Sequence, residues 1–94
     1  MKLSELTLEQ VKEFCGASND DSAGTLELIK SGALSFVLSE TGLTAKEADE
    51  HADLTLAALV LMNEMYTNRT YTVDSSSVNP FADQILSLHR VNLL

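Results

Sequence analysis

Apolar residues recur at helical spacing in the first half of the chain. One helix is predicted over residues 8–15, where one face carries Leu8, Val11, Phe14 and Cys15. Thr7 is its expected N-cap, with Gln10 completing a capping box. A second helix is predicted over residues 22–41, with a stripe formed by Leu26, Ile29, Ala33, Phe36 and Val37. Gly16 and Gly42 follow these segments, and glycine commonly ends helices.

The third apolar segment is apolar on more than one side. A capping box, formed by Thr44 and Glu47, predicts that a helix starts there and continues into this segment. From Leu54 to Met62 only Thr55 is polar. Because a helix that is apolar all round is buried all round, we expect either the central helix of the domain or a helix that packs on both the core and a neighbouring subunit.

Residues 70–78 break the helical pattern. Tyr71, Val73 and the threonines alternate, which favours a short extended arm. The next helix is expected to begin at Asn79, as N-cap, and Pro80, and one face of it carries Ala82, Ile85, Leu86 and His89. The sequence therefore predicts an all-α fold: one domain over residues 1–94, with four helices and a short extended arm between the third and the fourth.

The charge of the chain argues against binding to nucleic acid. Its 94 residues include 14 Asp and Glu but only six Lys and Arg, for a formal charge of −8. Nucleic-acid affinity rests mainly on Lys and Arg that neutralise phosphates, and six scattered basic residues make no patch. An acidic wall that repels nucleic acid is compatible with this balance.

Cysteine content and hydropathy further narrow the class of protein to which this chain can belong. The single cysteine, Cys15, excludes an intramolecular disulfide and is expected to be a small buried residue of the first helix. The start "MKLSELTLEQ" does not have the pattern of a signal peptide. The longest apolar run, over residues 56–62, is far shorter than the ~20 residues that span a bilayer. No association with a membrane is expected.

Two groups of polar residues suggest catalysis, but only weakly. Asp49 and Asp53, four apart on one predicted helix face and flanking His51, could bind a cation or act as an acid/base pair. Acidic residues are also common in the solvated first half of a helix, where they favour the macrodipole. A triad could be written from Ser87, His89 and Asp83, but no nucleophile elbow or oxyanion motif accompanies it. We therefore expect no enzyme activity, no metal and no cofactor.

The stretch "LVLMNEMYTNRTY", residues 59–71, ends the apolar segment in a polar tip. Tyr66 and Arg69 are three apart and can emerge on one side of the last helical turn. Tyr and Arg are enriched at interface hot spots, but an Arg also stabilises a helix C-terminus. Composition leaves both interpretations of the tip open, a helix cap and an interface.

Three blocks of the sequence carry a family likeness, at residues 6–43, 56–69 and 79–90. Together they resemble the head–tail connector (head-completion or adaptor) proteins of long-tailed phages. "LTLEQVKEFCGASNDDSAGTLELIKSGALSFVLSETGL" (6–43) is similar to the opening helices of that family, which end in Thr-Gly. "LAALVLMNEMYTNR" (56–69) resembles its hydrophobic helix closing in Tyr-x-Asn-Arg, and "NPFADQILSLHR" (79–90) its closing proline-led helix. The likeness covers about three quarters of the chain and lies in the order of the blocks as much as in their residues.

This resemblance implies a structural virion protein and not an enzyme. Such proteins form a homo-oligomeric ring under the portal, which extends the DNA channel and links the head to the tail. We expect a twelvefold ring on the portal protein, located at the head–tail junction after assembly in the host cytoplasm. Its other partner would be the next connector or tail-completion protein, and DNA would pass without specific binding.

The resemblance and the tip together predict the contact residues between subunits or with the portal. They are Tyr66, Asn68, Arg69, Tyr71, Val73, Arg90, Val91, Leu93 and Leu94. Two other functions remain as alternatives. One is a small acidic interaction module, such as an antitoxin or an inhibitor that mimics the charge of DNA. The other is a metal-dependent enzyme that uses Asp49, His51 and Asp53.

Overall fold

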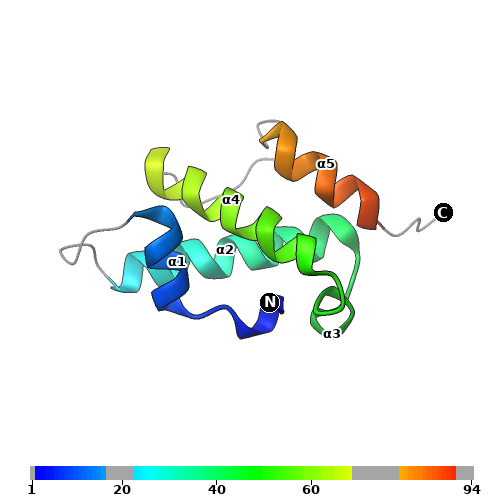
Figure 1. The fold of residues 1–94 in the computed structure, drawn as a ribbon, viewed down its shortest axis with the longest axis horizontal. Coiled ribbons are helices and arrows are strands. Elements are labelled where there is room, and N and C mark those ends of the chain that lie inside the picture. Colours follow the sequence, from blue (N-terminus) through cyan, green and yellow to red (C-terminus); the bar gives the residue numbers. More distant parts are fainter. Residues whose placement is uncertain (1, 17–22, 69–78, 91–94) are drawn as a thin grey trace.

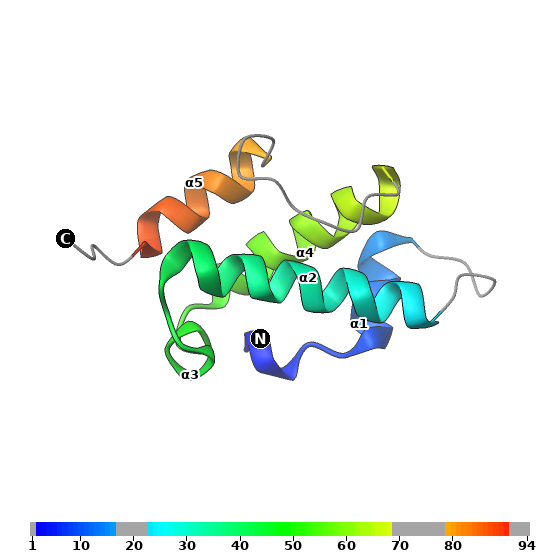
Figure 2. The same cartoon turned by 180° about the vertical axis from the view of Figure 1, so that it is seen from behind.

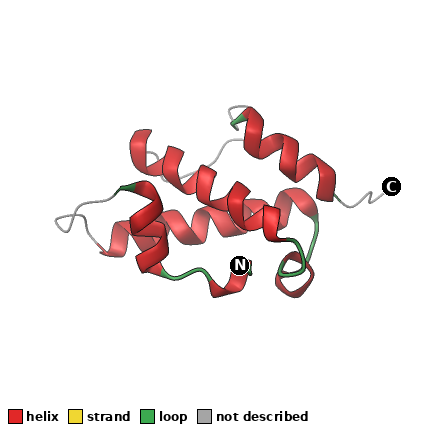
Figure 3. Ribbon diagram, in the orientation of Figure 1, coloured by secondary structure: helices red, strands yellow, loops and turns green. Residues whose placement is uncertain are grey.

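Six helical elements follow one another in the computed structural model, which describes residues 2–16, 23–68 and 79–90 (Figures 1 and 3). They are the 3-10 helix η1 (Leu3–Glu5) and the α-helices α1 (Leu8–Cys15), α2 (Ala23–Thr41), α3 (Ala45–Ala48), α4 (Ala52–Asn68) and α5 (Pro80–His89). No strand occurs within these described ranges. The predicted all-α fold with four main helices is confirmed, while the predicted arm at 70–78 lies outside the described residues.

Helix α4 is the centre of the domain. It packs against α1, α2 and α5, while α3 and η1 contact one another (Figure 1). Helices α2 and α4 lie side by side and run in opposite directions, as the front and rear views both show (Figure 2). The sequence left two expectations for the apolar third segment. The fold shows the first of them directly, because α4 is the central helix of the domain.

The core is built on one face of α4. This face is fully or almost fully buried and consists of Leu54, Thr55, Ala57, Ala58, Leu61, Met62 and Met65. Ala57 and Ala58 let neighbouring helices approach closely, because their side chains are small. The predicted stripe of α2 reaches this core, with Ile29, Ala33 and Val37 fully buried. Burial of such aliphatic side chains is the main favourable contribution to folding.

Local capping interactions set the starts of three helices as the sequence predicts. The Thr7 Oγ1 accepts a hydrogen bond from the Gln10 amide at 3.2 Å, and the Thr7 amide donates to Gln10 Oε1 at 2.9 Å. Thr44 and Glu47 repeat this reciprocal pair at the start of α3. At α5, Asn79 Oδ1 accepts from the Phe81 amide at 2.8 Å. Each bond satisfies a backbone donor that the first helical turn leaves unpaired.

The ends of α1 and α2 also follow their sequence signals. Gly16 and Gly42 have φ angles of 66° and 74°, in the left-handed region that glycine adopts without steric cost. Beside Gly42, the buried Thr41 hydroxyl donates to the Val37 carbonyl at 2.8 Å and accepts from the Leu43 amide at 3.3 Å. Thr41 can therefore be buried at the helix end without losing its hydrogen bonds.

The expected single helix from Thr44 into the apolar segment is wrong. The chain leaves helical geometry at residues 49–51, between α3 and α4. Asp49 ends α3 and binds the N-terminal segment, because its Oδ1 accepts from the Ser4 amide at 2.9 Å and its Oδ2 from the Ser4 hydroxyl. Ala48 is fully buried beside it. Because α3 packs on η1, the chain changes direction at residues 49–51 before α4 begins and packs in the core.

Among the described helices, none is both long enough and apolar enough to span a bilayer.

Candidate functional site

Helix α5 is fastened to the domain at both of its ends. At its start, the Asn79 side-chain amide donates to Glu64 Oε1 on α4 at 2.6 Å. At its end, His89 Nε2 lies 2.7 Å from Asp53 Oδ2 near the start of α4. These two polar contacts fix the rotation of α5 as well as its position, and so determine which of its residues face outward.

The outward side of α5 is apolar. Phe81 is 52% exposed and Leu88 is 75% exposed, while Ile85 between them is half-buried. These three residues, which we call the α5 ridge, stand at i, i+4 and i+7 and therefore lie along one side of the helix. The adjacent side of α5 is held in the core by Ala82 and Leu86, both fully buried, and Ile85 at the border also packs against the core. Helix α5 thus has a second apolar surface that its own fold leaves uncovered.

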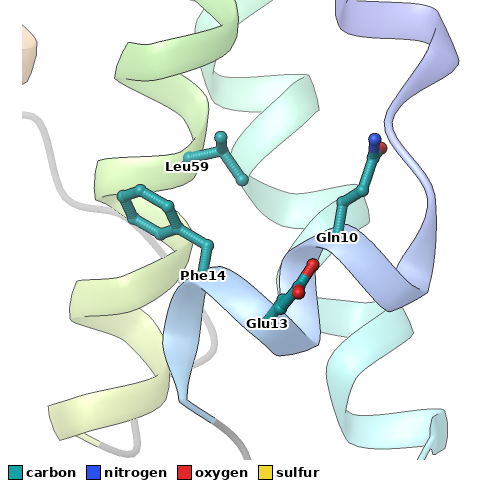
Figure 4. A pocket seen from close by; sticks show the side chains of 4 residues that line it. All are labelled: Gln10, Glu13, Phe14 and Leu59. Atoms are coloured by element: carbon teal, nitrogen blue, oxygen red, sulfur yellow. The ribbon is translucent and has the colours of Figure 1, made fainter.

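A shallow hollow between α1 and α4 is the second exposed apolar surface (Figure 4). It has a volume of about 370 Å³ and is lined by Gln10, Glu13, Phe14 and Leu59. The Phe14 ring lies over α4 beside Leu59, while Gln10 and Glu13 border the hollow from α1. We call these four residues the α1–α4 groove.

Phe14 differs from what the pattern of the first helix suggests. It is 44% exposed, whereas Val11 on the same predicted stripe is fully buried. Leu56, one turn before Leu59 on α4, is also 41% exposed. The outer side of α4 therefore keeps apolar residues near the surface, as the pattern of the third segment indicates. Its contact with a neighbouring subunit stays a prediction.

The groove and the ridge are separate surfaces. The groove belongs to α1 and α4, and the ridge belongs to α5. Helices α1 and α5 both pack on α4, and they lie on opposite sides of it in Figures 1 and 2. A partner on one surface therefore leaves the other available.

The polar tip of α4 is described only up to Asn68. Tyr66 is half-buried and packs against the core, and Asn68 is the exposed last residue of the helix. The other predicted contact residues of the arm and the tail lie outside the described ranges, namely Arg69, Tyr71, Val73, Val91, Leu93 and Leu94. Their roles remain predictions.

Arg90, also predicted as a contact residue, is tied to its own domain. Its guanidinium lies 2.8 Å from Asp83 Oδ1 and 3.6 Å from Glu40 Oε2 on α2, and it donates to the Ser87 hydroxyl at 2.7 Å. These contacts connect the end of α5 to α2. Since the Arg90 side chain is still 37% exposed, it also remains accessible to a partner.

The predicted pairing of Asp49 and Asp53 on one helix face is wrong. The break at 49–51 separates them, so that Asp49 binds Ser4 and Asp53 binds His89. The Ser4 hydroxyl, and then the Ser4 amide, lower the pKa of Asp49, because both stabilise the charged carboxylate. Within the described ranges, no group of three or more His, Cys, Asp or Glu side chains could hold a metal ion.

The triad written from Ser87, His89 and Asp83 is not assembled. The Ser87 hydroxyl donates to the backbone carbonyl of Asp83 at 2.9 Å, and His89 is bound to Asp53. The His51 ring lies beside the His89 ring, with the two ring centroids 4.3 Å apart. The two histidines and Asp53 therefore join the end of α5 to the start of α4 and the turn before it.

Cys15 is half-buried, which is less than the sequence suggests, and packs against the core. Burial raises the pKa of its thiol, because the thiolate is the form that loses hydration. A raised pKa leaves less thiolate at neutral pH and therefore a less reactive cysteine.

Phe81 and Leu88 were not predicted as contact residues from the sequence. The signal was present, because they continue through Ile85 as an i, i+4, i+7 series beside the stripe that contains Ala82 and Leu86. On such a short helix the two stripes merge, and only the observed burial separates them.

Searches against protein-family models, curated proteins and solved structures each find no match to this chain.

Proposed function

We propose that this protein is a phage head–tail connector, which assembles as a homo-oligomeric ring beneath the portal. The observation that carries the proposal is the presence of two different exposed apolar surfaces on one small domain, the α5 ridge and the α1–α4 groove. Ring contacts are heterologous, so each subunit must present two different patches. An isologous dimer would need only one.

The sequence blocks that resemble connectors support the same function. The block at 6–43 includes α1 and α2, the block at 56–69 includes most of α4, and the block at 79–90 includes α5. These are the helices that pack around the core, so the resemblance lies in the part of the chain that determines the architecture.

The charge of the chain also suits this role. A formal charge of −8 gives little opportunity for Lys or Arg to hold phosphates. DNA could therefore move through a ring of such subunits without specific binding. The proposed partners are further copies of the chain, the portal protein and the next connector or tail-completion protein. The ring is twelvefold on the portal and is part of the virion, and its role requires neither catalysis nor a cofactor.

The test is to express the protein with the portal protein of the same phage and to examine the product by native mass spectrometry and negative-stain electron microscopy. We expect an additional ring on the tail-facing side of the portal. Only free monomers in the presence of assembled portal would contradict the proposal.

The acidic charge alone also fits an inhibitor that mimics DNA. Such a protein would compete with DNA for a DNA-binding partner through its carboxylates, and its binding would weaken strongly as salt increases. The proposed connector instead uses apolar contacts, whose strength does not depend on ionic attraction. Salt-resistant association with the portal would favour the connector over this alternative.

A further inference from the structure

We infer that the α1–α4 groove of the free subunit binds a basic amphipathic helix of another protein. The groove is lined by Phe14 and Leu59 between Gln10 and Glu13, and it is an open hollow between two helices (Figure 4). Such binding goes beyond the proposed ring, because it concerns the free subunit and a partner of different sequence. The apolar floor of the groove, its shape and the charges at its margin each point to this occupant.

The groove exposes apolar side chains that the core of the monomer does not use. Phe14 is 44% exposed and Leu56 is 41% exposed, and neither belongs to the buried core or to the partly buried side chains that pack against it. Leu59 packs partly on the core and lies three residues after Leu56, on the same side of α4. Contact with an apolar partner would therefore remove Phe14 and Leu56 from water without displacing a core residue.

The shape of the surface fits a helix better than an extended segment. An extended segment commonly binds by adding a strand to the edge of a sheet, and the described ranges contain no strand. A bound helix instead places apolar residues three or four positions apart into a hydrophobic groove. Leu56 and Leu59, with Phe14 beside Leu59, form the apolar floor for such a helix.

The margin of the groove is acidic. Glu13 lines the groove and Glu9 lies one turn before it on α1, and both are exposed. Within the described ranges, neither carboxylate has a hydrogen bond or an ion pair. Lys12 is the single Lys or Arg of α1 and α4, and it is two residues from both Gln10 and Phe14, so it lies on another side of α1. The margin therefore favours a partner that carries Lys or Arg beside its apolar residues.

The other charges of the domain do not neutralise this margin. The acids of α4 are hydrogen-bonded to side chains at the two ends of α5. The exposed apolar side of α5 on a second copy offers no base, because Arg90 is paired with Asp83 and Glu40. A basic helix is thus the occupant that matches both the floor and the margin in dilute protein. Copies held together on a portal have a much higher effective concentration and would compete with this helix for the groove.

A synthetic helix tests the binding. The probe is a peptide of about 14 residues, or about four helical turns, with leucines along one side and lysines along the other. In an NMR titration of dilute isotope-labelled protein at low salt, the amide signals of α1 and of residues 56–59 should shift first. A control peptide with glutamate in place of each lysine should bind about tenfold more weakly, because its charges repel Glu9 and Glu13.

A pair of serine variants tests the apolar floor. Phe14→Ser removes the aromatic ring of the groove and should weaken binding of the lysine peptide about tenfold. Leu28→Ser removes a leucine that is 63% exposed on α2, outside the groove, and should leave the affinity within about twofold of the parent. Neither side chain is buried, so both variants should unfold at nearly the same urea concentration as the parent.

A pair of double variants tests the margin. Glu9→Gln with Glu13→Gln removes both carboxylates and should weaken binding of the lysine peptide about threefold to tenfold. Glu27→Gln with Glu50→Gln removes the same charge at exposed positions outside the groove. Because salt screens distant surface charges, this control should change the affinity by less than about twofold.

Several results would overturn the binding. They are no measurable affinity for the lysine peptide, equal affinity for the two peptides, amide shifts centred outside α1 and α4, and equal losses within either pair of variants. The titration uses dilute protein without portal, so it is independent of the connector function. Failure of the peptide to bind would refute this inference and leave the ring to be tested with the portal. Binding without any ring on the portal would support this inference and refute the connector function.

Discussion

The outer faces of α2 and α5 differ, although both helices pack their inner faces on α4. The outer face of α2 carries the exposed serines Ser31, Ser35 and Ser39, with Leu28 as an isolated large apolar residue. The outer face of α5 carries Phe81 and Leu88, joined by Ile85. A single exposed leucine is normal on a protein surface, but a continuous apolar side on a short helix is not required for folding.

This difference shows that one helix can carry both a buried apolar face and an exposed apolar face. Helix α5 already satisfies its folding role through Ala82 and Leu86, which are fully buried. Phe81 and Leu88 stay largely exposed, whereas Ile85 is partly buried and packs against the core. A contiguous exposed apolar surface often marks an interaction site, and the proposed ring would give the ridge that role.

The largest expected effect separates the two sides of α5. Leu86→Ala should reduce the free energy of unfolding by about 2–5 kcal/mol, because it removes a fully buried side chain and leaves a cavity. Leu88→Ala should change this free energy by no more than about 0.5 kcal/mol, because the side chain is already mostly hydrated. Urea denaturation of dilute protein measures both. Similar losses would mean that the ridge is part of the core.

Next in size is the loss of the contact that positions α5 at its start. Asn79→Ala should cost about 1 kcal/mol, because it removes the N-cap and the bond to Glu64. Asn79→Ser keeps a capping oxygen but is too short to reach Glu64. If chemical denaturation shows that serine restores most of the stability, the cap contributes more than the bond to α4. If serine restores none of it, the bond to α4 contributes more.

A smaller effect is expected at the other end of α5. Asp53→Ala removes the partner of His89 and should reduce the free energy of unfolding by about 0.5–1 kcal/mol, because the carboxylate is partly exposed. Hydrogen exchange of the α5 amides is the sensitive measurement, since loosening of this end should speed exchange there first. The comparison with α2 provides the control, because exchange at its outer serines should not change.

The smallest effect concerns pH and the link between Ser4 and Asp49. The pKa of Asp49 is below its ordinary value of 3.8 in the folded protein, so this bond stabilises the fold fully above that value and is lost as pH falls through the lower, folded pKa. Ser4→Ala removes the hydroxyl that contributes most to this shift. The difference in Tm between parent and variant should therefore shrink below about pH 4. A difference that is constant with pH would show that Asp49 is not its source.

Local chemistry is the part of this fold that can be predicted from the sequence. The caps at Thr7, Thr44 and Asn79 lie where their residue types indicate, because each requires only neighbours within three residues. The glycines that end α1 and α2 are local in the same sense. The apolar stripe of α2 likewise predicts a helix with a buried face, and Ile29, Ala33 and Val37 of that stripe are fully buried.

Tertiary packing decides what local signals cannot. The break at 49–51 depends on Asp49 meeting Ser4, 45 residues away in the chain, and the pairing of His89 with Asp53 joins residues that are 36 apart. Whether Phe14 and Leu88 are buried or exposed depends on which side of each helix packs against α4. A sequence period shows that a helix has an apolar side. Where a short helix has two apolar sides, only the position of the neighbouring helices determines which side stays exposed to water.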